Sequence, residues 1–160
     1  MPEYEMTLVD QQRIARDTMA FWFDTNGASF AFRAGQHADF GFKHPRTEGE
    51  GDNSRTLSLA SSPHDKRPVM IAMRMRKTPF KTALKSAVLG TKFIVSRPRG
   101  SFTLHRDITR PAVFLAGGIG ISPLAASFER PLRNVFHTDC ICSIRTGRRT
   151  MRRSSKNLKI

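Results

Sequence analysis

The sequence contains few of the residues that bind metal ions. Among its 160 residues there are only two cysteines, Cys140 and Cys142, and both lie near the C-terminus. Two thiolates are fewer than the four ligands that structural zinc sites and iron–sulfur clusters typically need. No cluster of histidine or cysteine with metal-ligand spacing occurs elsewhere in the sequence. The sequence therefore predicts no metal site.

Long apolar segments are also missing. A transmembrane helix needs about 20 consecutive apolar residues, and no stretch of the sequence approaches that length. The first ten residues contain three acidic residues and no basic one, whereas a secretory signal begins with a positively charged region. We therefore expect no membrane partner and a cytoplasmic location.

Acidic residues are scarce, and the resulting charge is unevenly distributed. The 27 Lys and Arg against 13 Asp and Glu give a net charge of +14. Residues 1–124 hold 18 basic and 11 acidic residues, and residues 125–160 hold 9 and 2, so each part carries +7. The second part shows almost no helical or strand periodicity. We interpret 125–160 as an aberrant, disordered basic tail.

High positive charge is typical of proteins that bind nucleic acid. Here no aromatic stacking pattern and no recognisable nucleic-acid-binding fold accompany the basic tail. Nucleic acid is therefore not the expected partner, and a non-enzymatic protein that binds nucleic acid through the tail is kept as an alternative.

Residues 1–108 have the pattern of a β-barrel. Thr78 and Pro79 are typical of a helix start, and the helical spacing of apolar residues continues as far as Gly90. Six short, apolar-rich runs with one helix predict a closed, six-stranded antiparallel barrel of the Greek-key type. The runs are Tyr4–Val9, Met19–Asp24, Gln36–Phe42, Arg55–Ala60, Val69–Met75 and Lys92–Ser96, and a further run, Phe30–Arg33, follows a turn at Asn26–Gly27.

A different kind of segment occupies residues 111–124. Val113–Ala116 is a continuous apolar run, as expected for a central parallel strand, and we place a domain boundary near 107–110. Gly117, Gly118 and Gly120 follow, and glycines allow the backbone to approach a dinucleotide phosphate closely. The segment predicts the first strand and glycine loop of an incomplete α/β nucleotide-binding fragment. Its G-G-x-G spacing is not the G-x-G-x-x-G fingerprint.

Two other patterns suggest phosphate binding. Arg55 and Ser58 would lie on opposite faces of a strand; an arginine suits phosphate, and a serine hydroxyl can bond a ring nitrogen. The start of the helix at Thr78 offers the free amides of Phe80 and Lys81 to a pyrophosphate. Taken singly, each pattern also fits an ordinary surface arginine, a strand serine or a capped helix.

Together and in this order, the segments resemble the ferredoxin–NADP⁺ reductase superfamily, in which a flavin-binding β-barrel precedes a nicotinamide-nucleotide domain. The similarity covers residues 4–124. The family motifs F-x-P-G-Q, R-x-[YF]-S, G-P-x-G-x-F and A-G-G-x-G-[IL]-[TS]-P match Phe32–Gln36, Arg55–Ser58, Arg97–Phe102 and Ala116–Pro123. The resemblance implies an FAD-dependent oxidoreductase that passes electrons from NAD(P)H through FAD to a ferredoxin-like or other redox partner.

The resemblance also implies roles for individual residues. Ser58 would lie beside flavin N5, the catalytic position, and Arg55 would contact the FAD pyrophosphate. Leu57 stands where the family has the aromatic residue that stacks on the flavin. Met73 and Arg74 match a strand that lines the flavin, Thr78, Phe80 and Lys81 match the phosphate-binding helix start, and Gly117, Gly118, Gly120 and Ser122 would hold NAD(P)H. Ala34 and Arg97 depart from the family's Pro and Gly.

Beyond Pro123 the sequence departs from the family, which continues with a helix, a second parallel strand and an acidic helix. One hypothesis is that the reading frame of the gene shifts near Leu124, because a shifted reading compatible with residues 124–158 can encode these elements. Sequencing the gene tests this hypothesis. An incomplete NAD(P)-binding part would leave weak flavin binding and little NAD(P)H turnover. A barrel that binds FMN or riboflavin instead, without NAD(P)H turnover, is a further alternative.

Overall fold

A computed structural model describes residues 3–44, 53–64, 68–105, 107, 113–128, 141–146 and 149–153 of the chain. For 113–118, 127–128, 141–146 and 149–153 we describe the backbone alone. Most of the loop expected before Ser54, the predicted boundary at 108–110 and Cys140 lie outside the described residues.

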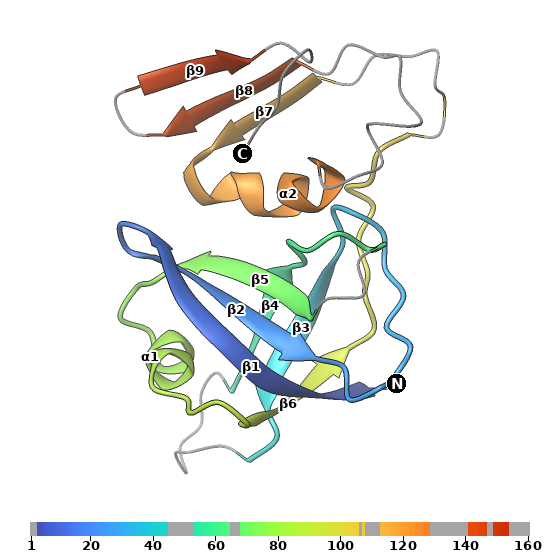
Figure 1. Cartoon of the computed structure of the whole chain (residues 1–160), viewed down its shortest axis with the longest axis vertical. Helices are drawn as coiled ribbons and strands as arrows, with labels where there is room; N and C mark the ends of the chain where they lie inside the picture. The colour runs from blue at the N-terminus through green and yellow to red at the C-terminus, as the bar shows by residue number, and fades with distance from the viewer. Residues whose placement is uncertain are drawn as a thin grey trace.

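Six antiparallel strands form the first and larger sheet. They are β1 (Glu3–Ala15), β2 (Thr18–Asp24), β3 (His37–Phe42), β4 (Ser54–Ser58), β5 (Val69–Arg74) and β6 (Lys92–Ser96), in the order β4-β3-β6-β1-β2-β5 (Figure 1). Because β6 lies between β1 and β3, the chain crosses over rather than following a simple meander. The predicted mainly β fold with six antiparallel strands is confirmed.

The predicted closure of the barrel is not observed. Strands β4 and β5 are the two edges of the sheet, and just beyond β4 a single bridge joins Leu59 to Ile71. There the Ala60 N–H donates to the Met70 carbonyl at 2.8 Å, and the Met70 N–H donates to Ser61 Oγ at 3.0 Å. The Ser61 hydroxyl therefore accepts the hydrogen bond from the Met70 N–H, which a longer ladder between β4 and β5 would use instead. We call this contact between the two edge strands the β4–β5 seam.

Two runs differ from their sequence prediction. Strand β1 continues beyond Val9 to Ala15, because β2 pairs with it from Thr7 to Ala15, across register shifts at Leu8–Asp10 and Arg13–Ala15. The run Phe30–Arg33 is not a strand. Its Phe30 ring instead packs edge-on against Tyr4, with ring centroids 5.0 Å apart, so aromatic contact and not a ladder holds this segment.

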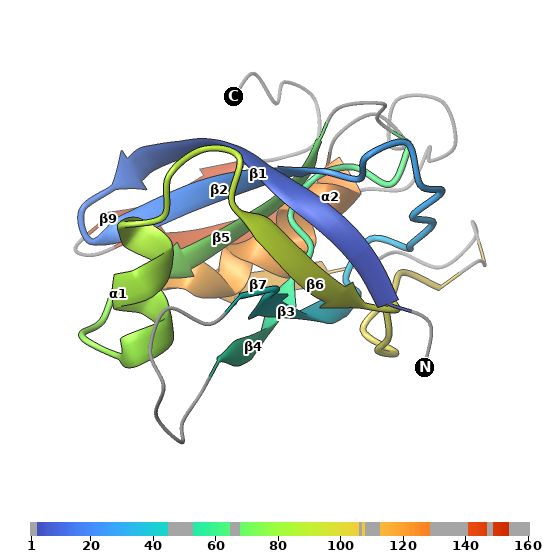
Figure 2. The same ribbon diagram turned by 90° about the horizontal axis from the view of Figure 1, so that it is seen from below.

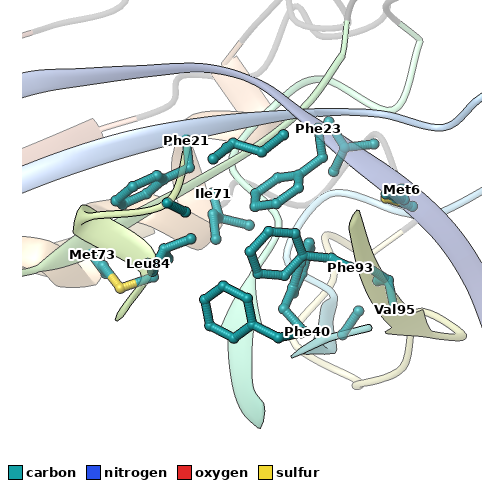
Figure 3. Packing of buried hydrophobic residues seen from close by; sticks show 14 of the residues in the cluster. Met6, Phe21, Phe23, Phe40, Ile71, Met73, Leu84, Phe93 and Val95 are labelled. Atoms are coloured by element: carbon teal, nitrogen blue, oxygen red, sulfur yellow. The ribbon is translucent and has the colours of Figure 1, made fainter. Parts of the chain in front are cut away.

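The core lies inside the curled sheet and is rich in phenylalanine (Figure 3). Alternate residues of each strand point inward, as the pattern of β3 shows, in which Ala38, Phe40 and Phe42 are buried. The Phe93 ring lies 5.1 Å from Phe23 and 4.5 Å from Phe42, between centroids. Such offset and edge-on ring pairs stabilise a core beyond simple area burial. This core positions the outward-facing residues of β3 and β4.

Helix α1 (Pro79–Lys85) packs at the open end of the sheet, beside β4 in the view of Figure 2. Thr78 is its N-cap, as the sequence predicts, and Phe80 and Leu84 are its buried residues. The helix ends at Lys85, with Ser86 as its C-cap, and not at Gly90; Ala87 is buried in the core and its N–H bonds the Leu84 carbonyl at 3.2 Å.

The chain then forms a second, three-stranded sheet. Its elements are β7 (Val113–Gly117), η1 (Gly118–Ile121), α2 (Ser122–Phe128), β8 (Ile141–Thr146) and β9 (Arg149–Arg153), with β8 parallel to β7 and antiparallel to β9. Figure 1 shows α2 between this sheet and β5. The predicted strand Val113–Ala116 and the glycine turn are both present.

The structure differs from the expected disordered tail at β8 and β9. Ile141, Cys142 and Ile144 make a short apolar segment, and its pairing with β7 supplies a ladder that local periodicity could not reveal. Residues 129–140, 147–148 and 154–160 lie outside the described residues. In the described part of the chain, no helix is both long and apolar enough to cross a membrane.

Candidate functional site

The β4–β5 seam is where the fold brings most of the sequence-predicted site residues together. Arg55, Leu57 and Ser58 lie on β4, and Met73 and Arg74 lie on β5. Helix α1 follows β5 directly along the chain, and η1 and α2 contact β5 from the other sheet. Segments that are far apart in the sequence therefore meet along one open edge.

The register of β4 separates the predicted residues onto two faces. Arg55 lies opposite Phe40, which is buried, whereas Ser58 lies opposite His37, which is half-buried on the outer face. The prediction that Arg55 and Ser58 point to opposite faces is confirmed. Leu57 is half-buried and packs against the core, so it anchors β4 to the barrel.

Strand β5 presents only one of its two predicted side chains to solvent. Met73 is 4% exposed and belongs to the core, opposite Met19 on β2. Arg74 is exposed, and its carbonyl accepts a hydrogen bond from Lys81 Nζ at 2.7 Å. Met73 can therefore meet a ligand only through its backbone.

Positive charges gather where β4 meets α1. Burial lowers the pKa of Lys81, and the charges of Arg76 and Arg55 lower it further. Arg55 and Lys81 come from different elements, so the fold has placed them together. We call Arg55, Arg76 and Lys81 the cationic group. Because a lowered lysine pKa means that its charged form is disfavoured in the folded chain, a bound anion would relieve this repulsion.

The start of α1 adds an unused polar atom to this region. Thr78 makes no side-chain cap bond, and its Oγ1 is buried without a hydrogen-bond partner among the described residues. A helix N-cap hydroxyl usually accepts a bond from an amide of the first turn. Phe80, in contrast, is 2% exposed and packs against Phe42 with ring centroids 5.6 Å apart. Its side chain is a core residue, and only its backbone amide could face a ligand.

The glycine loop lies at the end of β7, with Gly117 in the strand and Gly118 and Gly120 in η1. A Cβ built on Gly120 would meet no atom within 4 Å, so packing in the described structure does not require glycine there. Ser122 is 4% exposed, and its Oγ donates to the Ile119 carbonyl at 2.9 Å, with the Ala72 carbonyl of β5 at 3.5 Å. The hydroxyl of Ser122 is therefore already engaged within the fold.

Two curated reductase components are similar to part of the chain. No family model matches the chain. Over 79 residues, 48% of the chain, it is 32% identical to reductase component 1 of the terephthalate 1,2-dioxygenase of Comamonas sp. Over 96 residues, 58% of the chain, it is 31% identical to the carnitine monooxygenase reductase subunit of Escherichia coli strain K12. The chain spans only 23% and 28% of these two relatives.

Solved structures with the same fold cover nearly all of the chain. Phthalate dioxygenase reductase superposes with a TM-score of 0.72 at 24% identity, over 90% of the chain and 44% of that protein. A ferredoxin–NADP⁺ reductase from Neisseria gonorrhoeae with bound FAD and NADP superposes with a TM-score of 0.69 at 20% identity, over 91% and 58%. The chain therefore shares its fold with these reductases.

The outer face of β3 carries a row of polar residues that the sequence did not predict. Asp39 accepts hydrogen bonds from Thr56 Oγ1 and from Arg99 Nη2, the latter at 2.8 Å, and its N–H donates to Ser96 Oγ at 2.9 Å. The bond from Thr56 is the main cause that lowers the pKa of Asp39, followed by Arg99 and then by the field of His37. Only the strand register brings these residues together, which is why sequence reasoning missed them.

Removing the charge of Asp39 is expected to reduce stability at neutral pH and to matter less in acid. The lowered pKa of Asp39 means that the stabilisation is full above the unfolded value, near 4, and is lost as pH falls through the folded value. Because the side chain is 36% exposed, solvent screening limits the effect to about 1 kcal/mol or less. Urea unfolding of wild type and Asp39→Asn between pH 3 and 7 measures it. A difference that stayed constant down to pH 3 would contradict this account.

The described residues contain no group of three or more His, Cys, Asp or Glu that could hold a metal ion.

Proposed function

We propose that the chain binds FAD at the β4–β5 seam and serves flavin-dependent electron transfer from NAD(P)H to a redox partner. The observation that carries this proposal is the cationic group, in which Arg55 of β4 and Lys81 of α1 lie close enough for their charges to act on each other. A bound FAD would supply the redox chemistry, because amino-acid side chains do not carry out hydride transfer efficiently by themselves.

The residues at the seam fit a dinucleotide flavin. Its pyrophosphate is an anion, and an arginine fork can bond two phosphate oxygens at once. The buried Thr78 Oγ1, which lacks a partner among the described residues, offers one more polar group beside the first turn of α1. Arg55 and Lys81 would therefore bind the phosphates. Ser58 would present its hydroxyl on the outer face of β4. Leu57 packs against the core and so holds that strand in place.

The glycine loop supports the nicotinamide half of the proposal. Gly120 leaves open space above η1, and α2 and η1 contact β5, the strand that borders the seam. A nicotinamide nucleotide on this loop would therefore lie next to a flavin at the seam. Gly117, Gly118 and Gly120 would permit the close backbone approach, while Ser122 would hold the loop in shape through its bond to Ile119.

The relatives support a class of redox partner. Both curated relatives are named as reductase parts of oxygenases. We propose that this chain likewise passes electrons to an oxygenase component or to a ferredoxin-like protein.

The proposal is tested by flavin binding and then by reduction. Absorption between 350 and 500 nm is followed while FAD, FMN or riboflavin is added to the purified chain. FAD is expected to bind at least about tenfold more tightly than riboflavin, since only FAD offers a pyrophosphate to the cationic group. Equal affinity for FAD and riboflavin would contradict the assignment of the cationic group. Bleaching of the bound flavin by NADH or NADPH, without oxygen, tests the nicotinamide half separately.

A further inference from the structure

Three exposed aliphatic side chains come together beside β1, one of the two central strands of the first sheet. Val88 is 72% exposed, Leu89 is 56% exposed and Val9 is 37% exposed. Single apolar residues on a protein surface are ordinary, whereas a cluster of them can mark a contact surface. Val9 is far from the other two in the sequence, so the fold has brought the three together. We call Val9, Val88 and Leu89 the aliphatic patch.

Backbone hydrogen bonds place the loop between α1 and β6 against β1. The Leu8 N–H donates to the Thr91 carbonyl at 2.9 Å, and the Gly90 N–H donates to the Leu8 carbonyl at 2.8 Å. Figure 2 shows this loop passing beside β1. Both bonds involve Leu8, which precedes Val9, and the second involves Gly90, which follows Leu89. Val9 and Leu89 therefore lie beside each other at the surface.

Two local features hold the aliphatic patch outward. Val9 is the extra residue at the register shift between Leu8 and Asp10, and a bulge of this kind redirects a side chain out of the ladder pattern. The Val88 carbonyl accepts hydrogen bonds from the Thr91 N–H at 3.1 Å and from Thr91 Oγ1 at 2.6 Å, which close a tight turn. A surface that is already ordered loses less conformational entropy when it binds. The aliphatic patch is therefore preorganised for a contact.

Opposite charges border the aliphatic patch on its two sides. Lys85 lies in the exposed last turn of α1, before Val88, and the exposed Asp10 follows Val9 on β1. Asp10 accepts a hydrogen bond from the Gln11 N–H, and neither Asp10 nor Lys85 is in an ion pair among the described residues. Across a two-fold axis, identical surfaces meet in reversed order. A second copy would therefore bring its Asp10 to Lys85 and its Lys85 to Asp10.

We propose that the aliphatic patch is a contact surface between two copies of this chain, related by a two-fold axis. The inference goes beyond the proposed function and does not depend on it, because the patch contains no residue of the cationic group or of the β4–β5 seam. The reversed order of charges favours a second copy as the partner, since one surface supplies both members of each ion pair. The net charge of +14 opposes association, and the apolar contact is small, so the dimer is weak.

Sedimentation equilibrium of the full chain without flavin tests the proposal. It is run near 0.15 M salt, where charge repulsion is screened beyond about 8 Å. Between about 10 µM and about 1 mM chain, the average mass is expected to rise toward that of a dimer. The variant Val88→Ser/Leu89→Ser should weaken association by more than about tenfold, because each dimer loses four aliphatic side chains. Phe102→Ser is the matched control: Phe102 is 62% exposed beyond the other end of β6, and its replacement should leave association unchanged.

Charge reversal then tests whether the partner is a second copy. Lys85→Glu and Asp10→Lys should each weaken association by about threefold or more, because each dimer exchanges two ion pairs for like-charge contacts. The double variant Lys85→Glu/Asp10→Lys should restore association, since the two changes only exchange the charges. The inference is overturned by a chain that stays monomeric at the highest concentration, by an association that Val88→Ser/Leu89→Ser leaves unchanged, or by a double charge variant no tighter than the single ones. FAD binding is measured separately, and its absence would overturn the proposed function alone.

Discussion

The Gly35→Ala variant is expected to lose about 2 to 5 kcal/mol of folding stability, the largest such loss among the glycines whose surroundings are described. Gly35 has a φ of +91°, in the region that alanine adopts at a cost of about 1 to 2 kcal/mol. An added Cβ would also lie 1.7 Å from the Phe102 carbonyl oxygen. Since this obstacle is backbone, the whole segment would have to move, and overpacking of this kind costs about 1 to 3 kcal/mol.

Gly27→Ala is the matched control for this prediction. Gly27 has a φ of +81°, but a Cβ there would meet nothing within 4 Å. It should therefore show only the backbone cost, about 1 to 2 kcal/mol. Chemical unfolding of both variants measures the difference. If Gly35→Ala lost no more than Gly27→Ala, the close packing of the Phe102 backbone on Gly35 would not be correct.

Replacing Arg55 by alanine is expected to weaken FAD binding by about 10- to 100-fold. Hydrogen bonds that involve a charged group contribute about 1.5 to 3 kcal/mol, and each 1.4 kcal/mol corresponds to a factor of ten in affinity. Because Arg55 would contact the phosphates of FAD, which riboflavin lacks, the affinity for riboflavin should change little. Fluorescence titration of FAD and riboflavin measures both.

Two variants separate the role of Arg55 from a general effect of charge. Arg55→Lys keeps the charge but loses the planar fork, and its FAD affinity should lie between those of wild type and Arg55→Ala. Lys85→Ala removes a charge from the exposed last turn of α1, outside the cationic group, and should change FAD affinity by less than about threefold. A parallel loss for FAD and riboflavin in Arg55→Ala would indicate a damaged fold and would count against a phosphate contact.

The sequence was most informative where local chemistry decides the structure. Short apolar-rich runs located the six strands of the first sheet, and the pair Thr78–Pro79 located the helix start. The spacing of Arg55 and Ser58, three residues apart on one strand, correctly placed them on opposite faces. These features depend on residues that are close together in the sequence, so a single sequence is enough to predict them.

The features missed by the sequence depend on contacts between distant segments. The early end of α1 follows from Ala87 turning into a core built by other strands. The row around Asp39 exists because Arg99 and Thr56 reach it from two other segments. Likewise, the pKa of Lys81 is lowered by burial in the fold, then by Arg76 and then by Arg55, which lies on β4 and is distant in the sequence. No pattern in a short stretch of sequence predicts such contacts between distant segments.

The outward edge of β5 has a consequence for how copies of the chain behave in solution. An edge strand with free carbonyls is a template on which another chain can add a strand. Along β5, the carbonyls of Met70, Ala72 and Arg74 face Ala60 N, Ser122 Oγ and Lys81 Nζ, respectively, and each of these partners comes from a different segment. The β5 edge is therefore shielded from edge-to-edge pairing by its own chain, although the sheet does not close.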